Sequence, residues 1–427
     1  MGSEWSSTTL GAICSFAAGS AFPKAEQGDA VGKYPFIKVS DMSLAGNERY
    51  VTTANNWASE HTQTRLRAKV HPAGATVFAK IGVALTYNRR RILSQPTLID
   101  NNMMAAIPER GSVHPLFLYY LLCTVDFNDV VVGTALPYLN ISDLSHIRVQ
   151  LPSIKEQQAI ACILGALDDK IELNRRMNQT LEAMARAIFK SWFVDFDPVR
   201  AKMEGRDPGL PQALADLFPD RLVDSELGEI PEGWEVDTMG NHFRITMGQS
   251  PPGTTYNETG QGLPFYQGRV DFGFRFPARR VFCIAPTRFA EAGDTLVTVR
   301  APVGDTNMAS EHCSIGRGVA AIRHATGSRS YTYYFARSLQ SIFECFEAEG
   351  TVFGAINKED FSSIRCVVPP SKLVQRFDAQ CSPTDQQIER NEVESRTLTG
   401  LRDALLPKLI SGKIRVRNVT RITEEVS

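Results

Sequence analysis

Basic side chains next to aromatic and amide residues are the groups in this sequence whose types and spacing fit a chemical task. Arg89, Arg90 and Arg91 directly follow Tyr87 and Asn88, and further arginines stand in the second half of the chain. A guanidinium group can form paired hydrogen bonds with phosphates or guanine edges, and Tyr, Asn and Gln can accompany it in a groove. Each such residue has two interpretations, a nucleic-acid contact or an ordinary solubilising side chain. The candidate contacts are Lys38, Tyr87, Asn88, Arg89, Arg90, Arg91, Gln267, Arg269 and Arg300, with Arg279 and Arg280 beside them.

Common catalytic and cofactor motifs are missing from the sequence. Gly32-Lys33 and Gly412-Lys413 lack the flanking residues of a phosphate-binding loop, and the seven histidines show no metal-ligand spacing. Asp168-x-Lys170 has the residue types of half a nuclease cluster, but it lies in a helical pattern where a solvated charge pair is the favoured interpretation. We therefore expect no catalytic residue, cofactor or metal in this chain, and catalysis on a partner.

Bulk composition describes an ordinary globular protein. The 427 residues allow two or three domains, and 43% hydrophobic residues with a net charge of −1 exclude an overall basic nucleic-acid binder. The eight cysteines form no C-x-x-C pair, which favours a reduced, cytoplasmic setting. The longest apolar stretch, near Ala159 to Leu167, is far shorter than the roughly 20 residues of a membrane span.

A long internal repeat divides the chain into two similar halves. Gly133 begins one copy and Gly350 the other, an offset of 350 − 133 = 217 residues. In the preceding regions Trp5 and Gly19 recur as Trp234 and Gly248 at 234 − 5 = 229. Each half is therefore predicted to hold one mixed α/β globule. At the first offset Asn140, Asp143, Ile147, Arg148 and Pro152 recur as Asn357, Asp360, Ile364, Arg365 and Pro369.

Local patterns predict strands near 75–78 and 295–299 and helices near 115–124 and 331–339. From 153 to 193 the spacing changes to four, three, four, three, which is typical of a coiled coil. Its seam residues include Ile160, Leu164, Leu167, Ile171, Asn174, Leu181, Ile188 and Trp192. Adding 217 gives a more polar seam that includes Phe377, Ile388, Asn391, Leu398, Leu405 and Leu409.

Two polar features interrupt the apolar pattern of these helices, and a polar stretch lies between the helices in the sequence. Pro383 predicts a kink or a restart of the second helix, with Ser382 as its N-cap. Asn174 and Asn391 hold equivalent seam positions, where an amide either fixes the register or lies exposed on the helix. The polar stretch 195–233 reads as a linker with one short helix near 211–217.

The order of the elements predicts that the two helices run antiparallel, because each leaves one globule and leads towards the other. The first seam covers 192 − 160 = 32 residues, about 48 Å at ~1.5 Å per residue. That length matches roughly 14 base pairs at ~3.4 Å each. The sequence thus predicts two heads on a helical ruler, which favours DNA as the ligand of the basic clusters.

Three long motifs carry a family resemblance. The first motif is made of three runs, Leu151-Pro-Ser-Ile-Lys-Glu-Gln-Gln, Leu167-Asp-Asp-Lys-Ile-Glu-Leu-Asn-Arg-Arg and Phe189-Lys-Ser-Trp-Phe-Val-Asp-Phe-Asp-Pro-Val. The second motif is Ser225-Glu-Leu-Gly-Glu-Ile-Pro-Glu-Gly-Trp234. The third motif is Leu405-Leu-Pro-Lys-Leu-Ile-Ser-Gly-Lys-Ile414. The chain closely resembles the specificity subunits of type I restriction-modification systems over essentially its whole length. The base-reading residues do not carry over from the family, because its recognition loops vary.

The resemblance implies an α+β fold, with two α/β target-recognition domains joined by two long antiparallel helices in a coiled coil with pseudo-two-fold symmetry. It implies a non-catalytic subunit that reads a bipartite, asymmetric site on double-stranded DNA. Two methyltransferase subunits would dock on the helices, and two restriction subunits are optional further partners. S-adenosylmethionine, ATP and Mg would belong to those partners. The expected domains are 1–152 and 231–369 for recognition, 153–194 and 370–414 for the helices, and 195–230 for the linker.

Two other functions remain open at this level. A coiled-coil adaptor would use its two globules to bind proteins, and its complex would bind all DNA duplexes alike. An enzyme in its own right would transfer methyl groups without a partner. Unlike residues at equivalent positions, such as Lys38 and Gln267, predict two unlike half-sites if the ligand is DNA.

Overall fold

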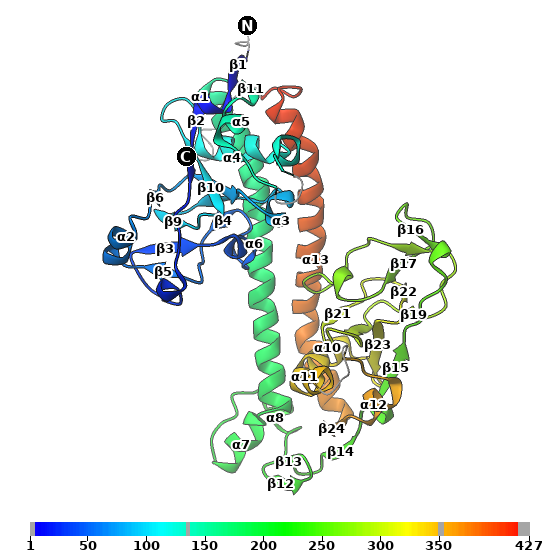
Figure 1. Ribbon diagram of the computed structural model, residues 1–427. Helices are drawn as coiled ribbons and strands as arrows, with labels where there is room; N and C mark the ends of the chain where they lie inside the picture. The colour runs from blue at the N-terminus through cyan, green and yellow to red at the C-terminus, as the bar shows by residue number, and fades with distance from the viewer. Residues whose placement is uncertain (1–4, 134–136, 349–353, 417–427) are drawn as a thin grey trace. The chain divides into compact units, whose positions relative to one another are not determined.

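The computed structural model describes residues 5–133, 137–348 and 354–416 (Figure 1). The chain forms two compact units, one of residues 1–172 and 395–427 and the other of residues 173–394. The start of the second repeat copy, Gly350, lies outside the described residues, as do 134–136 in the first copy.

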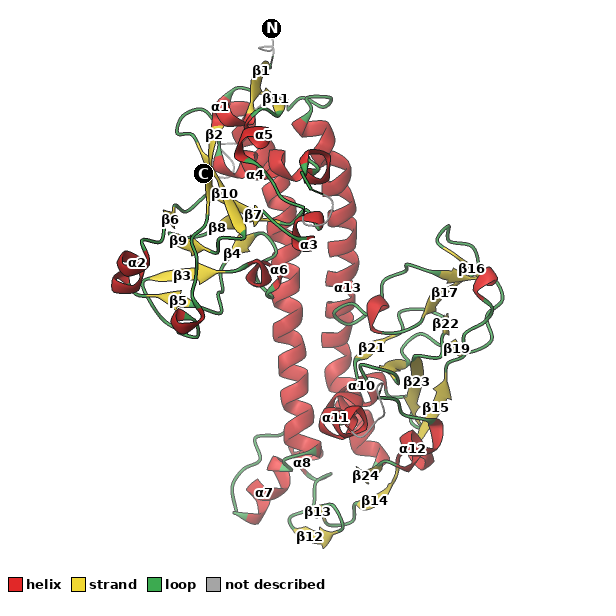
Figure 2. Cartoon of the chain, in the orientation of Figure 1, coloured by secondary structure: helices red, strands yellow, loops and turns green. Residues whose placement is uncertain are grey.

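The described residues of the first unit form three sheets, seen among the yellow strands of Figure 2. A two-stranded sheet pairs β1 (Ser6–Thr9) with β11 (Arg148–Leu151). A five-stranded sheet has the order β2 (Cys14–Ala18), β10 (Met103–Pro108), β7 (Thr76–Ala79), β8 (Arg90–Leu93), β4 (Tyr50–Val51). A four-stranded sheet has the order β5 (Trp57–Ala58), β3 (Tyr34–Ile37), β9 (Thr97–Ile99), β6 (Val70–His71).

Short helices connect these strands. They are α1 (Leu10–Ile13), η1 (Lys24–Glu26), η2 (Val39–Ser43), α2 (Glu60–Leu66), α3 (Val83–Thr86), α4 (Pro115–Cys123), η3 (Phe127–Val130) and α5 (Ile141–Ser145). α4 is apolar nearly all round, as expected of a helix buried in a core. Phe117 and Leu118 pack there with Ile160 and Leu164 of the long helix α6 (Ile154–Phe193).

The second unit repeats this arrangement. A two-stranded sheet pairs β14 (Glu235–Thr238) with β24 (Arg365–Val368). A four-stranded sheet has the order β15 (Phe243–Met247), β23 (Val319–His324), β20 (Thr295–Thr298), β21 (Thr306–Met308). A five-stranded sheet has the order β16 (Tyr256–Asn257), β18 (Phe282–Cys283), β17 (Leu263–Tyr266), β22 (Cys313–Ile315), β19 (Phe289–Ala290).

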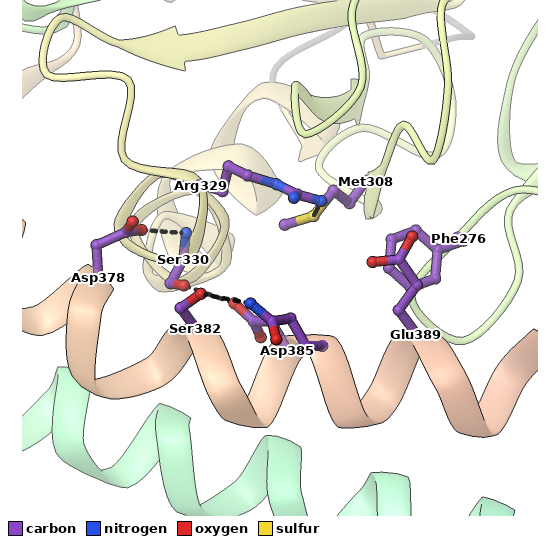
Figure 3. A pocket seen from close by; sticks show the side chains of 9 residues that line it. Phe276, Met308, Arg329, Ser330, Asp378, Ser382, Asp385 and Glu389 are labelled. Atoms are coloured by element: carbon purple, nitrogen blue, oxygen red, sulfur yellow. Dashed lines mark hydrogen bonds between the residues drawn. The ribbon is translucent and has the colours of Figure 1, made fainter.

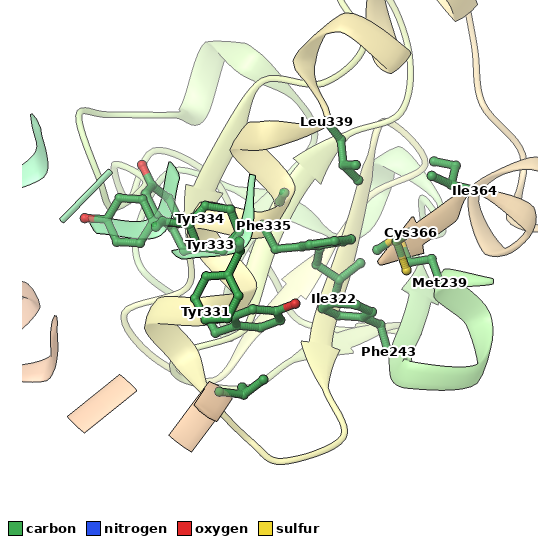
Figure 4. Close-up of a cluster of buried hydrophobic side chains, with 14 of the residues drawn as sticks. Met239, Phe243, Ile322, Tyr331, Tyr333, Tyr334, Phe335, Leu339, Ile364 and Cys366 are labelled. Atoms are coloured by element: carbon green, nitrogen blue, oxygen red, sulfur yellow. The ribbon is translucent and has the colours of Figure 1, made fainter. Parts of the chain in front are cut away.

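The helices of the second unit include α9 (Met239–His242), η4 (Gly253–Thr255), η5 (Arg269–Asp271), α10 (Arg329–Ser338), α11 (Gln340–Ala348) and α12 (Lys358–Ser363). α10 lies in an aromatic core, and Figure 4 shows Tyr331 and Phe335 beside Phe243 of β15. The Phe243 and Phe335 rings stack with centroids 4.6 Å apart. Phe377 of the long helix α13 (Ser371–Ile410) belongs to the same core.

The two units are built from the same series of elements. β1, β2 and β3 correspond to β14, β15 and β17 at an offset of 229, as β1 begins at Ser6 and β14 at Glu235 (235 − 6). The last elements correspond at 217, because α6 begins at Ile154 and α13 at Ser371 (371 − 154). The strands and helices predicted near 76, 115, 295 and 331 are present as β7, α4, β20 and α10. The predicted internal repeat and α+β class are confirmed.

Each unit contains one part of α6 and one part of α13, and the two parts run antiparallel. In the first unit Asp168 bonds Arg402, and Glu156 bonds Arg415 just beyond α13. In the second unit Asn178 bonds Asn391. Residue numbers therefore fall along α13 as they rise along α6, as predicted.

The predicted seam residues of both helices are buried or half-buried, so they pack inside the units. The predicted restart at Pro383 is wrong, because α13 is one helix from Ser371 to Ile410. A proline removes only one helical donor, and Cys381 and Ile388 on either side are packed in the unit's interior.

The linker region carries more structure than its sequence predicts. The expected short helix is present as α8 (Gln212–Ala215), but α7 (Asp197–Met203) and the hairpin of β12 (Leu222–Ser225) and β13 (Gly228–Pro231) accompany it. Within the described ranges, no helix is both long and apolar enough to cross a membrane.

Candidate nucleic-acid interface

Three loops of the first unit meet at one place. The segment after β3 begins at Lys38, the segment after β7 is Lys80–Gly82, and the turn between β9 and β10 is Asp100–Asn102. The Asp100 amide donates to the Ile37 carbonyl at 2.9 Å, and the Lys80 amide donates to the Asn102 carbonyl at 2.7 Å. We call these three segments the first loop cluster.

The second unit brings together the equivalent three loops. The Gly316 amide donates to the Tyr266 carbonyl at 2.8 Å, and the Val299 amide donates to the Gly318 carbonyl at 2.9 Å. A Cβ atom on Gly318 would lie 2.2 Å from the Gln267 carbonyl oxygen, so only glycine permits this close approach. The segments Gln267–Asp271, Val299–Ala301 and Gly316–Gly318 form the second loop cluster.

A buried aspartate closes one loop in each cluster. Asp41 is 1% exposed and accepts the Lys38 amide at 2.7 Å. Asp271 is 2% exposed and accepts the Gln267 amide at 2.8 Å. A carboxylate held by backbone donors rigidifies a loop before any ligand arrives, which lowers the entropy cost of binding.

The second loop cluster gathers three of the predicted contacts, Gln267, Arg269 and Arg300, and all three side chains are exposed. The Arg269 Nε lies 3.1 Å from Asp305 Oδ2. Arg300 pairs with Ala355 in an isolated β-bridge. Arg317, which was not among the predicted contacts, lies exposed in the Gly316–Gly318 segment. The sequence feature that could have revealed Arg317 is the pair of flanking glycines, Gly316 and Gly318, because such glycines mark a tight turn.

The first loop cluster contains Lys38, and the predicted residue Arg89 contacts η2, which directly follows Lys38. Arg89 donates to the Ser43 hydroxyl at the end of η2 and lies over the Tyr87 ring, with its Cζ atom 5.1 Å from the ring centroid. The Tyr87 side chain is 61% exposed. Lys38 donates from Nζ to Gln27 Oε1, which holds the ammonium group beside the Phe22 ring.

Three of the predicted contacts support the chain locally instead. Asn88 has φ +52° and donates from Nδ2 to Asp126 Oδ1 at 2.6 Å. Arg90 is 4% exposed and bonds main-chain carbonyls, and burial lowers the pKa of its guanidinium. Arg91 donates from Nε to the Met42 carbonyl at 3.1 Å. These three side chains therefore stabilise the loops around β8.

Other charged groups also have structural partners. Arg279 forms two hydrogen bonds with Glu311, and Arg280 binds the buried Asp271 at 3.2 Å. The expectation that Asp168 lies on a solvated face is wrong, because its side chain is 11% exposed and accepts from Arg402 at 2.7 Å. A buried carboxylate needs such partners.

Comparison with known proteins assigns the family. Residues 2–183 match the model described as the type I restriction modification DNA specificity domain. The putative type I restriction enzyme MjaX specificity subunit of Methanocaldococcus jannaschii is 30% identical over 325 residues, which cover 74% of this chain and 72% of that protein. The chain belongs to the type I restriction enzyme specificity subunits. Members of this family are non-catalytic DNA-recognition subunits.

Two more similarities agree with this assignment. The type I restriction enzyme HindI specificity subunit of Haemophilus influenzae is 26% identical over 382 residues, covering 74% of this chain and 81% of that subunit. The crystal structure of the type I restriction-modification system S subunit from M. genitalium has a TM-score of 0.59 and 17% identity, covering 95% of this chain and 96% of that one. This second match shows a shared fold, and the predicted family and fold class are confirmed.

Proposed function

We propose that this specificity subunit directs a DNA-methyltransferase complex to a bipartite, asymmetric site on double-stranded DNA, with one loop cluster for each half-site. The observation that carries the proposal is that the same three-loop arrangement occurs in both units with different exposed side chains. Loops held by main-chain bonds at a strand end form a rigid platform, and their side chains select the bases.

The two loop clusters differ in the chemistry they offer to DNA. The first presents Lys38, Lys80 and Asn101, with Tyr87 and Arg89 beside them, whereas the second presents the residues Gln267, Arg269, Arg300 and Arg317. Arginine forms two hydrogen bonds with guanine through its rigid planar fork, whereas lysine is a flexible point charge and a side-chain amide pairs best with adenine. We therefore propose unlike half-sites, with guanine among the bases read by the second unit.

The helices supply the proposed spacer and the proposed docking positions. The seam residues are packed inside the units, so we propose exposed apolar side chains of the two helices as the docking positions. Met184 on α6 is 58% exposed and Leu401 on α13 is 46% exposed. The two positions are equivalent, since 401 − 184 = 217. One such position in each unit fits two methyltransferase subunits, one per half-site.

The remaining parts of the proposal concern domains, partners and cofactors. We keep the domain boundaries 1–152, 153–194, 195–230, 231–369 and 370–414. Restriction subunits are proposed as further partners. S-adenosylmethionine, ATP and Mg are proposed to bind partner subunits, in the cytoplasm, where DNA and these cofactors occur together.

Single-molecule sequencing of modified adenines tests the proposed function. The chain is co-expressed with the methyltransferase subunit of the same system, in cells that lack other adenine methylation. We expect one new bipartite motif with unlike halves, present only when both proteins are expressed. A stable complex that produces no new motif would contradict the proposal and favour a protein-binding adaptor.

A further inference from the structure

A fully buried arginine joins the sheets of the second unit to its helical segments. Arg275 follows η5, and its side chain is 0% exposed. Its Nε and Nη2 atoms donate to Glu182 Oε2 of α6 at 3.1 and 2.7 Å, and its Nη1 donates to Asp385 Oδ1 of α13 at 2.7 Å. One side chain therefore binds a carboxylate on each helix.

Neighbouring groups complete this network. Arg275 Nη2 donates to the Tyr334 hydroxyl at 2.8 Å, and the Tyr333 ring centroid lies 3.9 Å from its Cζ atom. The Arg275 amide donates to Glu392 Oε1 at 3.0 Å, and Arg337 also binds Glu182. Burial lowers the pKa of Arg275, but the tyrosines and Asp385 more than offset it, so its pKa is raised and the group stays charged.

Further hydrogen bonds hold the Asp385 end of the network. Figure 3 shows Asp385 accepting from the Ser330 hydroxyl of α10, a bond of 2.6 Å, with Asp378 binding the Ser330 amide at 2.8 Å. The cavity beside these residues measures about 30 Å³, which is room for about one water molecule. Asp385 therefore keeps a hydrogen-bond partner on α10 besides Arg275.

The first unit has an arginine in the equivalent place. The Arg49 carbonyl accepts from the Ile92 amide at 2.8 Å, and the Arg275 carbonyl accepts from the Met308 amide at 2.8 Å. β8 and β21, which contain Ile92 and Met308, are equivalent strands. Arg49 and Arg275 thus hold the same position in the repeat.

Arg49 also reaches the helix of its own unit. Its Nη1 lies 3.8 Å from Asp168 Oδ2 and 3.2 Å from the Gly165 carbonyl of α6, and its Nη2 binds Asp169. Asp168 and Asp385 are equivalent, since 385 − 168 = 217. Tyr120 of α4 binds Asp168 at 2.6 Å. The same arginine-to-aspartate link therefore occurs in both units.

We infer that Arg275 and Arg49 are spacing-determining residues, each holding its recognition loops at one place and angle along its helical segment. Apolar packing is non-directional and tolerates small shifts, whereas charged hydrogen bonds hold donor and acceptor in one geometry. These arginines act through the helices and touch no base. The inference rests on the proposed function, and it names residues that decide which spacer lengths the complex accepts.

The experiment maps methylated adenines for the whole complex carrying substituted specificity subunits. The first variant, R275M/E182Q/D385N, removes the buried charges together and keeps similar side-chain volumes, because a lone R275M would strand two carboxylates. The second variant, R49M, tests the other unit. The control is R221M, because Arg221 is exposed and pairs with Glu232 in the linker.

We expect unchanged half-site sequences and relaxed spacing in both anchor variants. Methylation at sites with a spacer one base pair longer or shorter should rise about tenfold relative to the native spacer, a loss of roughly 1.4 kcal/mol in discrimination. The R221M complex should keep the native spacing.

Three outcomes distinguish a spacing role of the arginines from a role in general stability and from a failure of the proposed function. Folded variant complexes with native spacing would overturn the inference. Loss of methylation at every spacer in both variants would also overturn it, because the arginines would then serve general stability. A wild-type complex without any bipartite motif would instead contradict the proposed function.

Discussion

Asn391 of α13 donates a hydrogen bond from Nδ2 to Oδ1 of Asn178 on α6 at 2.8 Å, and both side chains are buried. Gln387 donates to Asn391 Oδ1 at 2.7 Å, and Asn174 donates to Glu394 at 2.8 Å. A buried amide in the seam between two helices finds its hydrogen-bond partner in only one alignment of the helices. A shift of one helix along the other would therefore leave these amides without partners. The alternative that Asn174 and Asn391 are exposed is excluded.

Replacement of Asn391 by Leu should destabilise the second unit by about 1–3 kcal/mol, because the buried Asn178 and Gln387 lose their partner. Urea unfolding followed by circular dichroism measures the change. The double variant N178L/N391L should recover part of the loss, and Gln179→Leu on the exposed face of α6 is the control. A double variant that shows the sum of both single losses would rule out the pairing.

Replacement of Arg300 or Arg317 by Ala should weaken binding of the complex to its DNA by roughly 1–3 kcal/mol and relax the sequence preference in one half-site only. Arg269→Ala extends the series to an arginine in an ion pair. Its matched control is Arg221→Ala, because both side chains are 66% exposed and both pair with an acid. Titration of labelled duplexes at several salt concentrations measures the effect. Equal losses for Arg269 and Arg221 would exclude a specific contact.

Acid should destabilise the first unit through His71. This residue of β6 is 0% exposed, and burial, with a smaller contribution from Lys69, lowers its pKa to about 4. In the unfolded chain the pKa of the His71 imidazole is about 6.5. The stability that comes from neutral His71 is therefore complete above that pH and is lost as the pH falls towards the folded value, about 2 kcal/mol by pH 5.

The His71→Phe variant tests this dependence, because a ring of similar shape carries no titratable group. Its urea midpoint should change less between pH 7 and pH 5 than that of the wild type. His61→Gln on the exposed face of α2 is the control. An identical pH slope in wild type and His71→Phe would refute the assignment.

Charge at the proposed docking positions should remove methyltransferase subunits one at a time. Met184→Glu and Leu401→Glu each place a carboxylate on an exposed apolar position, which a partner would have to desolvate. Native mass spectrometry should find complexes with one methyltransferase subunit for either variant and none for the double variant. Gln179→Glu should keep both. Full complexes in all four samples would place docking elsewhere.

Much of the architecture was predictable from the repeat, because one series of elements written twice must fold twice in the same way. The period of Ile160 and Leu164 predicted α6 nearly to the residue. Pro383 misled the prediction, since local propensity favours a break but tertiary packing keeps α13 whole.

The candidate site was less predictable, because adjacent residues in one arginine run have opposite environments. Arg89 is exposed whereas Arg90 is buried, since β8 starts between them and its side chains take different directions. Arg317 joins Arg300 only because two distant loops meet, and no local pattern shows that.

The loops of each cluster are joined by hydrogen bonds between main-chain atoms, as between Lys80 and Asn102 or between Val299 and Gly318. These main-chain hydrogen bonds do not depend on the identity of the side chains at the loop tips. Mutations at positions such as Lys38, Asn101 or Arg300 can therefore accumulate without a folding defect. Each unit has its own set of these backbone bonds, so substitutions at the loop tips of one unit leave the loops of the other unit in place, and the two proposed half-sites can change one at a time.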